Sequence, residues 1–157
     1  MQTFLPYADF AATARLLDQR RLGKQRVEAL QVLRGLTVAG YGWRHHPAVR
    51  MWSGYEEALV RYGLEICAVW EGSGRQDTCA RSLRTDLAQY TGRDVVRDQV
   101  ELESAGELPP WLGDPEFHRS HRSALVRKDP DHYGKVFADV PPDLPYVWPT
   151  SDRAGQT

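Results

Sequence analysis

The chain has 157 residues and a formal net charge of −1; 41% of its residues are hydrophobic and 26% are charged. These are ordinary values for a globular protein, and they exclude a globally disordered chain. It contains no apolar run of about 18 residues, no signal-peptide pattern and only two cysteines, Cys67 and Cys79, so we expect a cytoplasmic protein without membrane association or a disulfide framework.

The small net charge conceals a strong asymmetry along the chain. Residues 1–50 carry eight Lys or Arg against three Asp or Glu, residues 51–116 carry six against thirteen, and residues 117–157 carry six against five. A polyanionic ligand would therefore be expected to bind the two ends of the chain rather than its middle. This distribution permits nucleic-acid binding without requiring it.

The first third of the chain predicts an extended arm followed by helices. Residues 2–5 precede Pro6 and are expected to be extended, and one helix is predicted from about Asp9, as N-cap, to about Arg34. Gly23 inside this helix indicates either a break in the helix or a point where another segment packs close to its backbone. A second helix is predicted from Pro47 to about Gly72, because apolar residues recur at three- and four-residue steps: Trp52, Tyr55, Leu59, Tyr62, Ile66 and Val69.

The rest of the chain adds three predicted helices and an extended end. One helix is expected over residues 77–90, whereas the acidic segment 93–107 fits an edge strand or a loop equally well. Asp114-Pro115-Glu116 and Asp129-Pro130 are helix starts. The sequence therefore predicts an all-α fold: one compact helical domain over residues 1–150, with an extended N-terminal arm, a Pro-rich segment over 141–149 and a disordered tail over 151–157.

Glu28 is the first candidate for chemistry. It follows Lys24 by one helical turn and Arg21 by two, so the three charged groups share one helix face. This pattern fits a solvated face with weak ion pairs. It also fits a carboxylate that nearby cations keep anionic, and that can stabilise a developing positive charge or move a proton.

Two further segments carry clustered cations and histidines. Residues 43–50 enter a predicted helix N-terminus, where Arg44, His45, His46 and Arg50 fit either an anion site or one capping histidine among surface groups. Residues 118–133 fit phosphate contact or metal ligation; no conventional third ligand accompanies the histidines, so we expect no metal site. The candidates there are His118, Arg119, His121, Arg122, Arg127, Lys128, His132 and Tyr133.

Four motifs, Arg21–Glu28, Trp43–Trp52, Pro110–Ser123 and Arg127–Tyr133, resemble the pyrimidine-dimer DNA glycosylase superfamily, and most closely a bacterial branch of it. Within that branch the resemblance covers nearly the whole chain. To the phage-type enzyme it rests on the helix around Glu28, the order of the helices and a Tyr133-Gly-Lys135 element.

The resemblance implies a compact all-α glycosylase with AP-lyase activity that needs no cofactor. In this family the N-terminal α-amine attacks the sugar C1′ and forms an imine, a glutamate assists, and β-elimination cleaves the strand. Glu28 matches that glutamate, and the large Gln2 is expected to keep Met1, whose amine would be the nucleophile. Backbone α-amines lose their proton closer to neutral pH than lysine side chains do, which suits such a role.

The resemblance further implies damaged or abasic duplex DNA as the partner, with no membrane and no obligate protein partner. Arg21, Lys24 and Arg26 would join the two clusters above in binding it. Two alternatives remain open: a non-catalytic nucleic-acid-binding module, and a metal-dependent or small-molecule enzyme centred on His45, His46, His118, His121 and His132.

Overall fold

The computed structural model describes residues 1–155, and over these residues the chain forms eight helices and no strand. This confirms the predicted all-α fold class. None of the helices in this part of the chain is long and apolar enough to cross a membrane. The helices are α1 (Phe10–Leu16), α2 (Gln19–Thr37), α3 (Pro47–Arg50), α4 (Glu56–Gly72), α5 (Cys79–Thr91), α6 (Gln99–Ser104), α7 (Pro115–Lys128) and α8 (Pro130–Val136).

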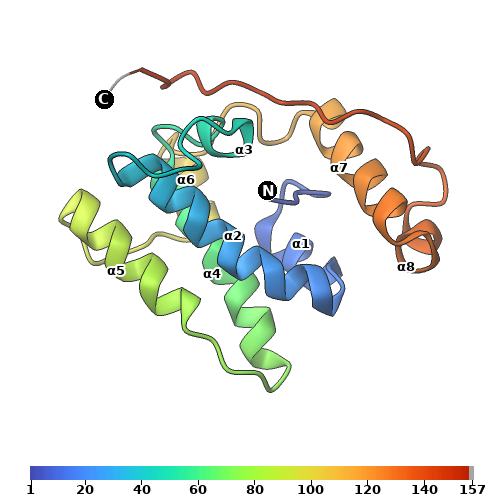
Figure 1. Cartoon of the computed structure of the whole chain (residues 1–157), viewed down its shortest axis with the longest axis horizontal. Coiled ribbons are helices and arrows are strands. Elements are labelled where there is room, and N and C mark those ends of the chain that lie inside the picture. The colour runs from blue at the N-terminus through green and yellow to red at the C-terminus, as the bar shows by residue number, and fades with distance from the viewer. Residues whose placement is uncertain (156–157) are drawn as a thin grey trace.

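Helix α4 lies at the centre of the fold and packs against α1, α2 and α5 (Figure 1). Its predicted apolar stripe is buried, including Leu59, Tyr62 and Ile66. At Gly63 a Cβ atom would lie 2.7 Å from Leu83 of α5 and 3.1 Å from Ala29 of α2, so the three helices meet closely at this point. This packing fixes the backbone of α2, which carries Glu28.

The single helix predicted from Asp9 to Arg34 is wrong, because the chain breaks into α1 and α2. Leu17 and Asp18 have extended backbones, and the Asp18 carboxylate accepts a hydrogen bond from the Arg21 N–H as the N-cap of α2. A capping aspartate competes with helix continuation because its side chain satisfies an otherwise free N–H group. Gly23 stays helical; a Cβ there would lie 3.0 Å from the Trp70 ring, which confirms the expected close approach.

Two other boundaries differ from the prediction. The helix expected from Pro47 to Gly72 is divided by turns at residues 51–54 into α3 and α4. Segment 93–107 contains α6 rather than a strand, because Asp98 and Glu101 form a reciprocal capping box at its start. Helix α6 also holds the arm: the Gln99 side chain donates to Ala8 O and accepts from the Phe10 N–H, both at 2.8 Å.

The two terminal segments are extended, as predicted. The N-terminal arm runs between α2 and α7, and the C-terminal segment runs from α8 along the edge of the molecule past α3 (Figure 1). Within the tail expected to be disordered, Ser151 donates to Ser53 O and Arg153 pairs with Glu107. Residues 156–157 of that tail lie outside the described residues, and the division at residue 150 stays a prediction.

Candidate functional site

A cavity of about 340 Å³ lies where the N-terminal arm meets α2. Four lining residues are lysine or arginine and one, Glu28, is a carboxylate, so the cavity favours an anionic ligand. It shares three lining residues with a broader groove of about 800 Å³ that follows α2 toward Trp70. The cavity is lined by Met1, Gln2 and Phe4 of the arm, by Arg20, Arg21, Lys24, Gln25 and Glu28 of α2, and by Lys128 and Tyr146.

Gln25 connects the arm to Glu28. Its buried side-chain amide donates to Gln2 O at 2.9 Å and accepts from the Phe4 N–H at 2.9 Å. The same amide nitrogen donates to Glu28 Oε2 at 2.6 Å. One side chain therefore fixes both the path of the arm and the orientation of the carboxylate, and Met1 and Glu28 consequently border the same cavity.

Met1 lines this cavity, and its α-amine forms no ion pair within the described residues. Met1 is half-buried, and among residues 1–155 no carboxylate lies within 4.0 Å of its nitrogen. The pKa of His46 is lowered by burial and, secondarily, by the positive charge of this amine. The joint action of Met1 and Glu28 stays a prediction; the structure provides their common cavity.

Arg21 is held at the cavity rim by two carboxylates. Its Nη1 lies 3.1 Å from Asp18 Oδ2 and 4.0 Å from Asp129 Oδ2. The Tyr133 hydroxyl donates to the other Asp18 oxygen. Burial alone would raise the pKa of Asp18, but this hydrogen bond and the charge of Arg21 outweigh it and hold the pKa below its ordinary value. Arg21 is thereby oriented before any ligand binds.

Three residues predicted to contact DNA are instead buried. Tyr133 is fully buried against Asp18, and His118 and His121 are 5% and 0% exposed. Burial lowers the pKa of both histidines, that of His121 to about 3, and the charge of His118 adds to the effect on His121. All three side chains are turned toward protein partners in this structure, and their contact with DNA stays a prediction. The residue spacing could not reveal that a distant segment covers this face of α7.

The histidines of the metal-centred alternative are not gathered into one site. His45 and His132 are exposed on separate elements, whereas His118 and His121 are buried in α7. His46 caps α3, since its Nδ1 accepts from the Ala48 N–H at 3.0 Å. Over the described residues, no group of three or more His, Cys, Asp or Glu is arranged to hold a metal ion.

The predicted cations divide between free and engaged side chains. Arg26 pairs with Asp77 and stacks at 4.3 Å on the Trp70 ring, so it lines the broader groove along α2 and not the cavity itself. Arg122 donates to Pro6 O, and Arg127 donates to carbonyl groups of the C-terminal segment. Arg127 is nevertheless exposed, and Arg44, also exposed, donates to Tyr41 O. The other exposed side chains of the set are Lys24, His45, Arg50, Arg119, Lys128 and His132.

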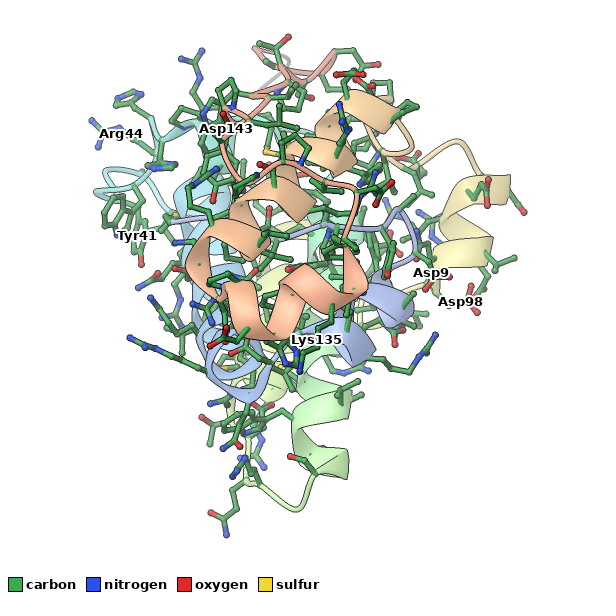
Figure 2. All side chains as sticks on the ribbon, turned by 90° about the vertical axis from the view of Figure 1, so that its right-hand side faces the viewer. Asp9, Tyr41, Arg44, Asp98, Lys135 and Asp143 are labelled. Carbon is green, nitrogen blue, oxygen red and sulfur yellow. The ribbon has the colours of Figure 1, made fainter. Side chains whose placement is uncertain are left out.

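Only part of this exposed set lies at the cavity. Lys24 and Lys128 line it. Arg44 projects outward with Tyr41 from one edge of the molecule, whereas the acidic Asp9 and Asp98 lie at the opposite edge (Figure 2). Sequence reasoning missed Arg20, Gln25 and Tyr146. Of these, Gln25 had a readable signal, because it is a polar residue three positions after Leu22 in the buried stripe of α2.

A family model described as pyrimidine dimer DNA glycosylase matches residues 1–83, about half of the chain. The matched part contains the arm and helices α1 to α4, and hence Met1, Glu28 and the α2 cations. Helix α7 and Tyr146 lie outside it. No curated protein and no solved structure matches the chain.

Proposed function

Because the chain belongs to the pyrimidine dimer DNA glycosylase family, we propose that it is a DNA-repair glycosylase that also cleaves abasic sites, with the Met1 α-amine as its nucleophile. One observation carries this proposal: Met1 and Glu28 share a cavity that four cationic side chains surround. The Gln25 amide supports it further, because it bonds both the arm and the Glu28 carboxylate.

The proposed reaction begins when the unprotonated α-amine attacks C1′ of the damaged nucleotide. The bond from C1′ to the base breaks, and the base leaves with the electron pair and takes a proton from solvent water. The C1′–O4′ bond then opens, the nitrogen proton is transferred to O4′, and an iminium ion forms. The Glu28 carboxylate would carry that proton and stabilise the iminium charge. Loss of a proton from C2′ and departure of the 3′ phosphate complete the β-elimination.

DNA binding would depend on phosphate contacts around the cavity. Arg20, Lys24 and Lys128 are exposed and form no ion pair within residues 1–155. Such contacts are independent of sequence and weaken with salt. Because C1′ lies within the duplex, the target nucleotide must leave the base stack or the duplex must bend before the amine can reach it.

The test is reductive trapping with borohydride on duplex DNA that contains one abasic site. We expect a covalent adduct that maps to the N-terminal peptide, disappears after acetylation of the amine and falls strongly in Glu28→Gln. Glu103→Gln, at an exposed position of α6, is the matched control and should trap normally.

Two outcomes would contradict the proposal. An adduct on Lys24 or Lys128, the other amines of the cavity, would assign the nucleophile to a side chain. Salt-sensitive DNA binding without any adduct would favour a non-catalytic binding module.

A further inference from the structure

Helix α7 carries four buried polar side chains, His118, Ser120, His121 and Ser123. Buried polar groups are normally hydrogen-bonded, so their partners show what they hold in place. Those partners belong mainly to the two terminal segments of the chain: the histidines bind the N-terminal arm and the serines bind the C-terminal segment.

The two histidines bind opposite sides of one residue, Leu5. His121 Nδ1 accepts from the Leu5 N–H at 3.0 Å, and His118 Nδ1 donates to Leu5 O at 2.8 Å. His118 Nε2 accepts from the Gly113 N–H at 2.8 Å, so the hydrogen of this neutral ring is on Nδ1. Both backbone groups of Leu5 are thus fixed, four residues from the Met1 amine.

The two serines bind the segment that contains Tyr146. Ser123 Oγ donates to Pro141 O at 2.6 Å and accepts from the Leu144 N–H at 3.0 Å. Ser120 Oγ accepts from the Val147 N–H at 3.1 Å. These bonds fix the position of this segment on either side of Tyr146, whose ring lines the cavity and lies 5.6 Å from the His121 ring.

We infer that α7 assembles the cavity from both ends of the chain: His118 and His121 are positioning residues for the α-amine, and Ser120 and Ser123 are positioning residues for Tyr146, which contacts the bound nucleotide. The chemical part of this inference rests on the function proposed above. Helix α7, to which this positioning role is given, lies outside the residues 1–83 that the family model matches.

The geometry makes such positioning necessary. An extended chain advances about 3.3 Å per residue, so a shift of the arm by one residue would move the amine by that distance. A misplacement of about 1 Å can lower a reaction rate by about a hundredfold. The arm has no strand partner within the described residues, and therefore its position depends on side chains such as those of α7. Tyr146 adds an aromatic wall of the kind on which unstacked bases pack.

Two substitutions of His118 separate positioning from stability. In His118→Asn the amide nitrogen takes the place of Nδ1 and keeps the bond to Leu5 O. In His118→Gln the side-chain amide reaches the place of Nε2, so the variant keeps the hydrogen bond from the Gly113 N–H and loses the hydrogen bond to Leu5 O. We expect the single-turnover trapping rate of His118→Gln to be at least about tenfold below that of His118→Asn, with DNA affinity within about twofold. Equal rates, or rates that follow the unfolding midpoint alone, would overturn the histidine half of the inference.

Ser123→Ala tests the second half of the inference, the positioning of Tyr146 by the two serines. It should weaken binding of abasic DNA about three- to tenfold and leave the single-turnover rate at saturating DNA unchanged, because the amine stays in place while Tyr146 loosens. A change in rate with unchanged affinity would contradict this assignment.

Amide hydrogen exchange provides a readout that does not depend on activity. His118→Gln should accelerate exchange in residues 2–8, and Ser123→Ala should do so in residues 142–148. Exchange that is unchanged, or equal in both segments for both variants, would refute the division of roles. If the wild-type protein traps no DNA, but the two variants still show this exchange pattern, the proposed function fails while the positioning of the two segments by α7 stands.

Discussion

Replacing Gln25 with leucine should separate the arm from α2 with little effect on the helix itself. Leucine is similar in size to glutamine and forms helices well, so the change mainly removes hydrogen bonds. Gln2 O loses its donor and the Phe4 N–H loses its acceptor, both in buried residues. The Tyr62 hydroxyl keeps Phe4 O as a partner at 2.8 Å.

The expected loss of stability follows from these two groups. A buried backbone group left without a partner costs about 1–3 kcal/mol, so Gln25→Leu should lower the free energy of unfolding by about 2–6 kcal/mol. For a chain of this length the melting temperature should fall by roughly 5–20 °C. The Glu28 carboxylate also loses its 2.6 Å donor, so the trapping yield should fall at temperatures where the variant is still folded.

The measurement is urea denaturation followed by circular dichroism, together with borohydride trapping. Gln89→Leu is the matched control, because Gln89 is exposed on α5 and its side chain makes no hydrogen bond within the described residues. If Gln25→Leu is within about 0.5 kcal/mol of that control, the amide does not hold the arm and the reasoning fails.

Three further changes test other parts of the site. Tyr133→Phe removes the hydroxyl that donates to Asp18; we expect a loss of about 1.5–3 kcal/mol in denaturation and a rise in the pKa of Asp18, measurable by NMR titration. Lys128→Gln should reduce the slope of log K against log salt by about one for DNA binding, whereas Lys135→Gln on α8, which does not line the cavity, should not. His121 has a pKa of about 3 in the folded protein and an ordinary value of 6.5, so the unfolded chain binds more protons between these limits. Stability should therefore fall as the pH drops from 6.5 toward 3, by up to about 1.4 kcal/mol per pH unit from this group. Urea denaturation at several pH values should give a shallower dependence for His121→Asn; an unchanged slope would show that His121 is not the group responsible.

Local patterns were sufficient to predict α5, α7, α8 and the body of α4, though not its start at Glu56, because apolar spacing and Asp-Pro helix starts act within a few residues. The break before α2 was missed, since a capping aspartate looks like any charged residue of a helix until its side chain is seen to accept the Arg21 N–H. The Asp98–Glu101 capping box could have been read from the sequence, and it would have predicted α6.

The candidate site shows the same limit more strongly. Arg21, Lys24 and Glu28 share one helix face, so their proximity was predictable from spacing alone. His118 and His121 were assigned to DNA because they stand among arginines, yet the residue they bind is more than 110 positions away in the sequence. Such a contact depends on the packing of the arm, which no local spacing encodes.

The groups that hold the arm nearest the amine are neutral, and this has a consequence for the site. Gln25, Tyr62, His118 and His121 bond residues 2–5 without adding a charge. An acidic side chain could have anchored the arm through an ion pair with the amine, but it would have offset the cations that attract phosphates and competed with Glu28 for the same charge. Neutral hydrogen bonds fix the position of the arm and leave Glu28 as the one carboxylate among the residues that line the cavity.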